Sequence, residues 1–144
     1  MSQINMMAKI SIIGCGNSGG LIAVSFANIG YQIDIIDINY KKFKTLPENL
    51  ISEGYLNPIV ADATKIENLK KVMDPESNIC IILSGNDSNN ALISQIVKNE
   101  LNIPKVICEL NEEITSELYL SLGFIVINKN DLFKKNILDL FERD

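Results

Sequence analysis

The stretch from Lys9 to Asp37 places the strongest constraint on what this chain can fold into, because it combines two strand patterns with a glycine turn and a helix. A β-branched run at 10–13 leads into residues 14–19, which read GCGNSG and have the form G-x-G-x-x-G. A helix-compatible stretch ends at Gly30, and a second β-branched run stops at Asp37. This order is typical of the first unit of a dinucleotide-binding sheet.

Each part of the motif has a physical role in holding a pyrophosphate. Gly14 turns tightly out of the strand, Gly16 lets a pyrophosphate approach the backbone because it has no Cβ, and Gly19 allows close helix packing. The helix then begins with free N–H groups and a partial positive charge. Asp37, at the end of the second strand, can accept hydrogen bonds from ribose hydroxyls. The stretch predicts nucleotide binding, and the alternative is a glycine turn in an empty domain of the same class.

Asp37 also bears on which nucleotide binds. A ribose 2′-phosphate would be repelled by this carboxylate, and no Arg directly follows it in the sequence. We therefore expect NAD(H) or an adenine nucleotide (ATP, ADP or AMP), with NADP disfavoured. The pattern G-x-x-x-x-G-K-[ST] is absent, so an ATP site of the Walker type is not supported.

Strand and helix patterns alternate along the whole chain. Strands are expected at 9–13, 32–37, 59–61, 78–83, 106–110 and 124–127, and helices at 18–29, 40–52 (interrupted by Pro47), 64–73, 88–101, 112–122 and 130–141. This alternation predicts an α/β fold, a Rossmann-like doubly wound parallel six-stranded sheet with helices on both faces. The expected organisation is a loose leader at 1–8, a nucleotide-binding domain at 9–128 and an amphipathic C-terminal helix at 129–144.

Polar loops follow four of the expected strands. They hold Gly14–Gly19, Asp37, Asp62 and Ser84–Asp87. Because right-handed crossovers bring the carboxyl ends of parallel strands to one edge of the sheet, these loops should converge there. The convergence is the strongest functional argument in the sequence.

Three local patterns give more specific expectations. Thr64 and Glu67 match a capping box at the start of a helix. The expected core residues of the helix at 88–101 are Ala91, Leu92, Ile96, Val97 and Leu101. The last helix carries a broad apolar face made of Leu132, Phe133, Ile137, Leu138, Leu140 and Phe141. That face either docks onto its own sheet or packs against a second subunit or a partner.

Composition narrows the possible functions. The 144 residues include no His and carry a formal net charge of −5. Without His, the usual general base and the commonest metal ligand are missing, and an acidic chain without a basic block argues against nucleic acid. The cluster Lys41, Lys42 and Lys44 is expected to be a solvated helix face, with a nucleotide-phosphate contact as the alternative. No apolar run approaches the ~20 residues that cross a bilayer, so we expect a cytoplasmic protein without direct membrane insertion.

The three cysteines are widely spaced and odd in number, so a disulfide framework or metal site is not expected. Cys80 and Cys108 lie in apolar strands and should be small core residues. Cys15 is expected to be a small residue in a tight turn. The alternative is a thiol whose pKa is lowered by the neighbouring helix N-terminus.

Several motifs together resemble a known family. They are the loop 14–19 with Ala23, the acid Asp37, residues 61–64 (ADAT, similar to the family's G-D-A-T) and residues 84–87 (SGND) with Asn90. Over about residues 9–133 the chain resembles the N-terminal nucleotide-binding lobe of RCK/KTN domains, also called Trk-type. Glu109 stands where that family often has Arg, and the smaller C-terminal lobe of many members has no counterpart before Asp144.

The resemblance implies a role for each matching position. The glycine loop would hold phosphates, and Asp37 the adenosine ribose with Ile38 beside the adenine. Asp62 and Ala63 would contact the adenine edge, and residues 84–86 would line the phosphate or second ribose. The candidate binding residues are Gly14, Cys15, Gly16, Asn17, Ser18, Gly19, Asp37, Ile38, Asp62, Ala63, Ser84, Gly85 and Asn86.

The resemblance also implies a regulator rather than an enzyme. Family members are cytoplasmic, pair into homodimers or larger rings, and control potassium flow through a channel or transporter membrane subunit by ligand-dependent dimer geometry. Two alternatives remain, a small NAD-dependent oxidoreductase and a nucleotide-free dimerisation module. An oxidoreductase would need an acid/base pair, and the single Tyr-x-x-x-Lys match, Tyr40 to Lys44, directly follows the ribose acid.

Overall fold

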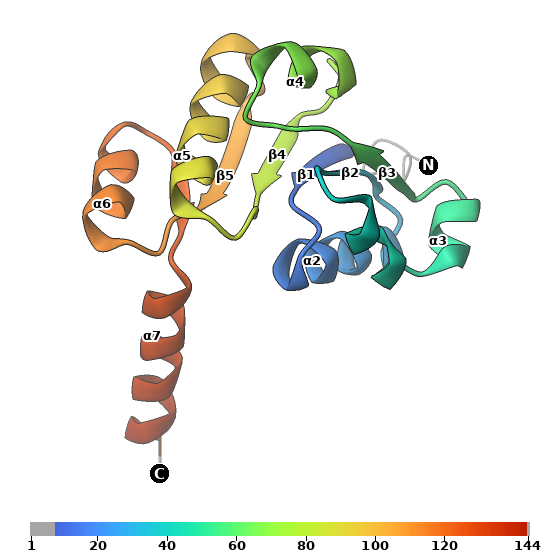
Figure 1. Cartoon of the computed structure of the whole chain (residues 1–144). Coiled ribbons are helices and arrows are strands. Elements are labelled where there is room, and N and C mark those ends of the chain that lie inside the picture. Colours follow the sequence, from blue (N-terminus) through green and yellow to red (C-terminus); the bar gives the residue numbers. More distant parts are fainter. Residues whose placement is uncertain (1–7, 144) are drawn as a thin grey trace.

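Alternating strand and helix patterns produce a parallel sheet, as expected. The computed structural model describes residues 8–143 (Figure 1), so the expected leader at 1–8 lies, apart from Ala8, outside the described residues. The strands are β1 Lys9–Ile13, β2 Gln32–Asp37, β3 Leu56–Val60, β4 Ile79–Ile82, β5 Lys105–Glu109 and β6 Ile125–Ile127. The helices are α2 Asn17–Asn28, α3 Glu48–Ser52, α4 Ile66–Val72, α5 Asp87–Gln95, α6 Glu113–Ser121 and α7 Lys129–Glu142, with a 3₁₀ helix η1 at Tyr40–Thr45 and a π turn η2 at Ile96–Glu100.

The sheet has the strand order β3-β2-β1-β4-β5-β6, and every neighbouring pair is parallel. This confirms the predicted fold class. The order reverses between β1 and β4, which are hydrogen-bonded neighbours at the centre of the sheet. Ligands of open α/β sheets bind beside such a reversal, at the carboxyl ends of the strands.

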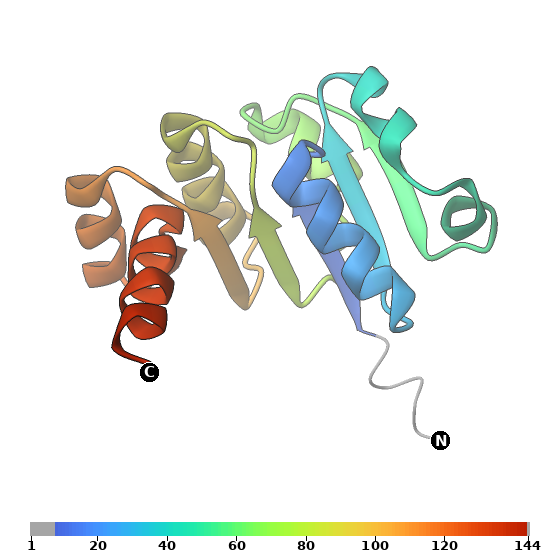
Figure 2. The same ribbon diagram turned by 90° about the horizontal axis from the view of Figure 1, so that it is seen from below.

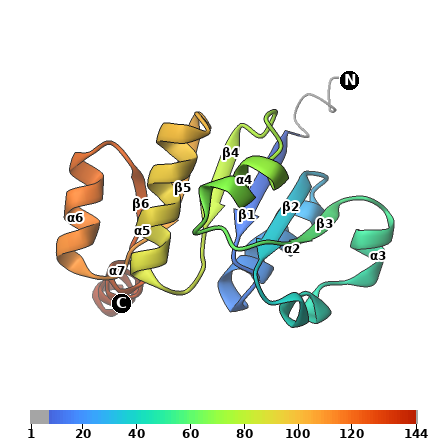
Figure 3. The same cartoon turned by 45° about the horizontal axis from the view of Figure 1, so that its top comes forward.

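Helices cover the sheet on both faces (Figure 3). On one face, the helical segments α2 and α3 bury side chains such as Ala23, Ala27 and Leu50 against strand residues that include Ile12 and Ile35. Figure 2 shows α2 lying across this face beside β1. Alternate strand side chains point the other way, and on that second face α4, α5 and α6 form a separate core. Its residues include Ile36, Leu69, Cys80, Ile82, Ile93, Val97, Cys108 and Tyr119.

Two of the differences from the expected boundaries have a clear structural cause. Strand β3 covers 56–60 rather than 59–61, and it contains Pro58. Proline is tolerated there because β3 is an edge strand that pairs with β2 alone. Helix α4 begins at Ile66 with Lys65 at its N-cap, and no described side chain caps it. The predicted capping box of Thr64 and Glu67 is therefore wrong, because Thr64 bonds to Asp62 instead.

The core face of α5 also differs from the expectation. Leu92 is 46% exposed, whereas Ile93 and Val97 are buried. Buried Asn90 and Ser94 share this inward face, and both are polar, so hydrophobic periodicity misses them. The helix then widens into the π turn η2, in which Val97 is buried.

Helix α7 projects away from the sheet (Figure 1). It has no buried residue, and its large apolar side chains are between 49% (Ile137) and 85% (Phe141) exposed. The expectation that this face docks onto the chain's own sheet is therefore wrong, because no element of residues 8–143 covers it. Within the same residues, no helix combines the length and the apolar character that a bilayer crossing requires.

Candidate functional site

The glycine loop connects β1 to α2 through two close backbone contacts. Gly14 has a φ of +107°, and a Cβ there would lie 2.3 Å from the carbonyl oxygen of Leu83. A Cβ on Gly19 would lie 1.7 Å from the carbonyl oxygen of Gly14. Only glycine fits at these two positions, so both serve the packing of the loop itself.

Gly16 lies in a different environment, because a Cβ there would meet no atom within 4 Å. It is the N-cap of α2, and none of the described side chains caps this helix. The first turn of α2 also contains no acidic residue. The start of α2 therefore presents backbone N–H groups and the positive end of the helix dipole to an open space.

Asp37 ties the glycine loop to the end of β2. Its side chain is buried, its Oδ2 accepts a 2.8 Å hydrogen bond from the backbone N–H of Cys15, and its Oδ1 accepts one of 2.8 Å from Asn39. The Lys42 Nζ lies 3.8 Å from Oδ2. Each carboxylate oxygen has two lone pairs, so both retain capacity to accept from ribose hydroxyls.

Asp62 holds the loop after β3. Its Oδ1 accepts hydrogen bonds from the Thr64 hydroxyl at 2.6 Å and from the Thr64 backbone N–H at 3.1 Å. These bonds, led by that of the hydroxyl, lower the pKa of the Asp62 carboxyl. Asp62 is therefore a charged acceptor at neutral pH.

A cavity of about 130 Å³ at the carboxyl ends of the strands brings six of the predicted residues together. Its lining includes Gly14, Asp37, Ile38, Asp62, Ala63 and Ser84. A second cavity of about 560 Å³ is lined by Cys15, Gly16 and Asn17, and Lys42 lines both. The predicted convergence of polar loops at this edge is confirmed.

Four predicted residues lie outside the lining of these two cavities. Gly19 is buried against Gly14, and the Ser18 hydroxyl accepts a hydrogen bond from Lys129. Gly85 has a φ of +87°, and Asn86 is the N-cap of α5, where its side chain accepts from the Asn89 N–H. In the described structure, Gly19 and Gly85 allow the backbone conformation and packing of their loops, and Asn86 caps α5.

The Cys15 thiol is not activated by the nearby helix N-terminus. Burial, followed by the charge of Asp37, raises its pKa to about 11 although Lys42 acts in the opposite direction. The thiol is therefore protonated at neutral pH, and the expectation of a small residue in a tight turn is confirmed. Cys80 and Cys108 are buried core residues, also as expected.

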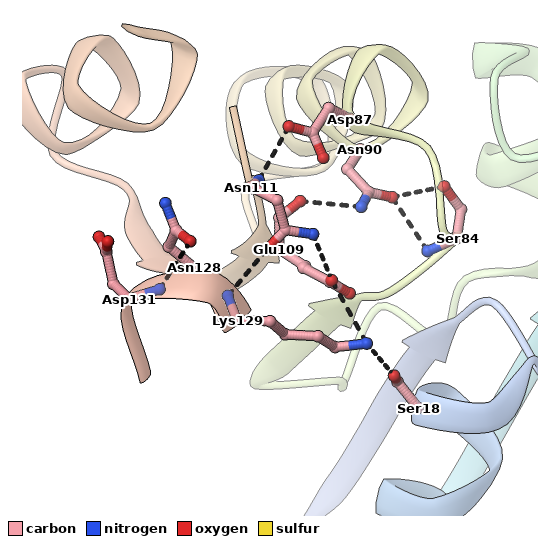
Figure 4. A network of polar contacts seen from close by, with 9 residues as sticks. All are labelled: Ser18, Ser84, Asp87, Asn90, Glu109, Asn111, Asn128, Lys129 and Asp131. Carbon is pink, nitrogen blue, oxygen red and sulfur yellow. Dashed lines mark hydrogen bonds and ion pairs between the residues drawn. The ribbon is translucent and has the colours of Figure 1, made fainter. Parts of the chain in front are cut away.

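A polar network links the loop after β4 to the end of β5 (Figure 4). The amide oxygen of buried Asn90 accepts a 3.0 Å hydrogen bond from the Ser84 backbone N–H, and its amide nitrogen donates one of 2.8 Å to the carbonyl of Glu109. Asp87 accepts 2.7–2.8 Å hydrogen bonds from the backbone N–H groups of Asn111 and Glu112. The edge formed by β4 and β5 is thereby held as one unit.

Comparison with known families identifies the domain. Residues 10–129, most of the chain, match the model of the TrkA-N domain. This chain belongs to the TrkA-N family. The Trk system potassium uptake protein TrkA of Mycobacterium tuberculosis is 23% identical to it over 108 residues, covering 72% of this chain and 45% of that protein. This TrkA-N chain thus spans less than half the length of the curated relative.

Solved structures share the TrkA-N fold at low identity. The TrkA-N domain of the inner membrane protein ybaL from Escherichia coli has a TM-score of 0.79 and 13% identity, covering 94% of this chain and 98% of that one. The Kef C-terminal domain of Shewanella denitrificans in its AMP-bound form has a TM-score of 0.75 and 15% identity, covering 94% and 83%. The GsuK channel bound to NAD has a TM-score of 0.65 and 16% identity, covering 83% and 21%.

Sequence reasoning missed several side chains at the edge of this TrkA-N domain. Lys42, expected to be solvated, lies beside Asp37. Lys129 contacts Glu109 and also Ser18 of the glycine loop, which lies 111 residues earlier in the chain. No local pattern in the sequence signals such a contact. Among the described residues, no group of three or more His, Cys, Asp or Glu side chains could hold a metal ion.

Proposed function

We propose that this TrkA-N domain binds NAD(H) or an adenine nucleotide (ATP, ADP or AMP) at the carboxyl edge of its sheet. The observation that supports this best is the meeting of three features beside the reversal between β1 and β4. They are the uncapped start of α2, the Asp37 carboxylate and the Asp62–Ala63 loop. Backbone N–H groups at a helix start suit phosphates, and a carboxylate at the end of β2 suits ribose hydroxyls.

Asp37 and Lys42 bear on the choice between NAD(H) and NADP(H). The Asp37 carboxylate can accept from unphosphorylated ribose hydroxyls, whereas a 2′-phosphate would bring two negative groups together. Lys42, at 3.8 Å from Oδ2, is already paired with this carboxylate. We therefore propose that NADP(H) binds more weakly than NAD(H).

A thermal-shift titration tests both proposals. We expect one of NAD⁺, NADH, AMP, ADP or ATP to raise the unfolding midpoint, because a ligand that binds only the native state adds RT ln(1 + [L]/Kd) to stability. At 100 times Kd this is about 2.7 kcal/mol, or roughly 8 °C for a domain of this size. NADPH should give a smaller shift than NADH at equal concentration. If none of these compounds raises the midpoint, the chain is a nucleotide-free interaction module.

Exposed apolar side chains support a second subunit as the partner of α7. Those of α7 are about half or more exposed. On α6 and at its C-cap, the apolar side chains of Ile114, Leu118, Leu120 and Leu122 are 52–75% exposed. A helix of 14 residues is marginal in water without tertiary packing, and clustered apolar exposure marks an interaction surface. We propose that α6 and α7 pack against another copy in a homodimer or a larger ring.

The proposed regulation follows from this arrangement. A nucleotide that binds one dimer geometry better than another shifts the population between the two. We propose that this shift controls potassium flow through a membrane channel or transporter subunit. In this proposal the domain lies at the cytoplasmic side of that subunit. The relative's potassium uptake system supports this assignment.

Solution scattering tests the dimer and its response. We expect a particle of at least twice the monomer mass, whose scattering curve changes when the nucleotide that gives the largest thermal shift is added. An unchanged curve at saturating nucleotide would refute regulation through dimer geometry while leaving the binding site intact.

The oxidoreductase alternative receives no support from the structure. Tyr40 is 60% exposed, and neither it nor Lys44 is among the described residues that line the two cavities. We therefore propose a regulatory domain rather than an enzyme.

A further inference from the structure

Lys129, the first residue of α7, reaches across the sheet edge to the glycine loop (Figure 4). Its Nζ donates to the Ser18 hydroxyl and lies 3.4 Å from Oε2 of Glu109. Ser18 belongs to the first turn of α2, and Glu109 ends β5. One ammonium group thus connects the two halves of the sheet at their carboxyl edge.

Glu109 places a negative charge at this edge. Its side chain is only 6% exposed, and Oε2 also accepts a 2.7 Å hydrogen bond from the amide of Asn111. A nearly buried carboxylate next to the start of α2 would repel a phosphate unless a cation stood between them. In the described structure that cation is Lys129.

The backbone of α7 holds Lys129 in this position. The Lys129 N–H donates a 2.8 Å hydrogen bond to the Asn111 side chain, and Asn128 caps the helix by accepting from the Asp131 N–H. The ammonium group itself remains accessible, because the Lys129 side chain is 51% exposed. An ammonium group has three N–H donors, so Lys129 can bind a phosphate while it keeps its contact with the nearly buried Glu109 carboxylate.

We propose that Lys129 binds a phosphate of the nucleotide at the start of α2 and stands between that phosphate and the carboxylate of Glu109. This inference rests on the proposed nucleotide site and adds its phosphate-binding side chain. Lys42 lies at the ribose side of the loop, where it pairs with Asp37. Because Lys129 begins α7, the phosphate contact also lies at the base of the proposed dimer helix.

Calorimetric titration of four variants with ADP and NAD⁺, both of which carry a pyrophosphate, tests this role. Lys129→Gln should weaken binding about tenfold, because a charge-assisted hydrogen bond is lost. Lys129→Arg should restore most of the affinity. Glu109→Gln should tighten binding, because the competing carboxylate is gone. Lys134→Gln removes the same charge from an exposed position of α7 and should leave affinity within twofold of the parent.

The outcomes separate this inference from the proposed function. If the parent binds and Lys129→Gln binds equally well, Lys129 is a structural side chain and the inference alone is overturned. If Lys134→Gln loses as much affinity as Lys129→Gln, the effect is one of net charge and the inference is again overturned. If the parent binds neither ADP nor NAD⁺, the inference falls, and the proposed function fails as well when the thermal-shift titration finds no ligand.

Discussion

Replacing Gly16 by Asp should abolish nucleotide binding while leaving the domain at least as stable as the parent. The backbone at Gly16 is extended, with φ −80° and ψ −160°, and a Cβ there meets no atom within 4 Å. Asp is also a better N-cap than Gly by a few tenths of a kcal/mol. The new carboxylate would accept the N–H groups that a phosphate needs. At 4 Å from a phosphate it costs about 4 kcal/mol at an effective dielectric constant of 20, roughly a thousandfold in affinity.

Two variants control for this result. Gly16→Asn introduces an equally good N-cap without a charge. It therefore separates competition for the N–H groups from electrostatic repulsion. We expect it to weaken nucleotide binding less than Gly16→Asp does. Ser25→Asp adds the same charge at an exposed position further along α2 and should bind like the parent. Affinity is measured by titration and stability by denaturant unfolding. Parent-like affinity in Gly16→Asp would show that phosphates do not bind at the start of α2.

Two adjacent glycines of α2 should respond in opposite directions to the same substitution. A Cβ at Gly19 would lie 1.7 Å from the backbone oxygen of Gly14, so the loop or the helix must move. We expect Gly19→Ala to lower the free energy of unfolding by about 3 kcal/mol or more. The added methyl group would clash with backbone atoms, which cannot move aside as a flexible side chain can. A Cβ at Gly20 meets nothing within 4 Å. Gly20→Ala should therefore raise the free energy by about 0.5–1 kcal/mol through helix propensity.

Urea unfolding of the two variants at one temperature gives both values. The comparison is internally matched, because both changes add one methyl group to neighbouring positions of the same helix. Equal unfolding midpoints for Gly19→Ala and the parent would contradict the close contact of Gly19 with Gly14. A loss of stability in Gly20→Ala would contradict the open space at that position.

Much of the fold could be predicted because its signals are local. The β-branched runs, the glycines and the helix interruption at Pro47 lie within a few residues of the elements that they define. Five of the six strands formed within one residue of the expected bounds, and β3 is the exception. The errors occurred where tertiary context overrides a local pattern. Pro58 lies within a strand because that strand is at an edge, and Thr64 bonds to Asp62 rather than capping α4.

The candidate site was only partly predictable for the same reason. The positions of Gly16 at the start of α2 and of Asp37 at the sheet edge could be predicted from the spacing of the motif. Lys42 and Lys129 could not, because nothing around them in the sequence distinguishes them from solvated lysines. Their partners are Asp37 and Glu109, and the second pair is brought together only where α7 begins beside β5.

The residue order alone established the sheet class, the glycine turn and the acid after β2, since backbone conformation and apolar periodicity depend on near neighbours. Packing decided which charges meet at the carboxyl edge and which apolar faces stay uncovered. Glu109 pairs with Lys129, which begins α7 and lies 20 residues later in the chain. The same helix projects away from the sheet with its apolar side chains exposed. Such contacts depend on where separate elements end in space, which no local pattern in the chain specifies.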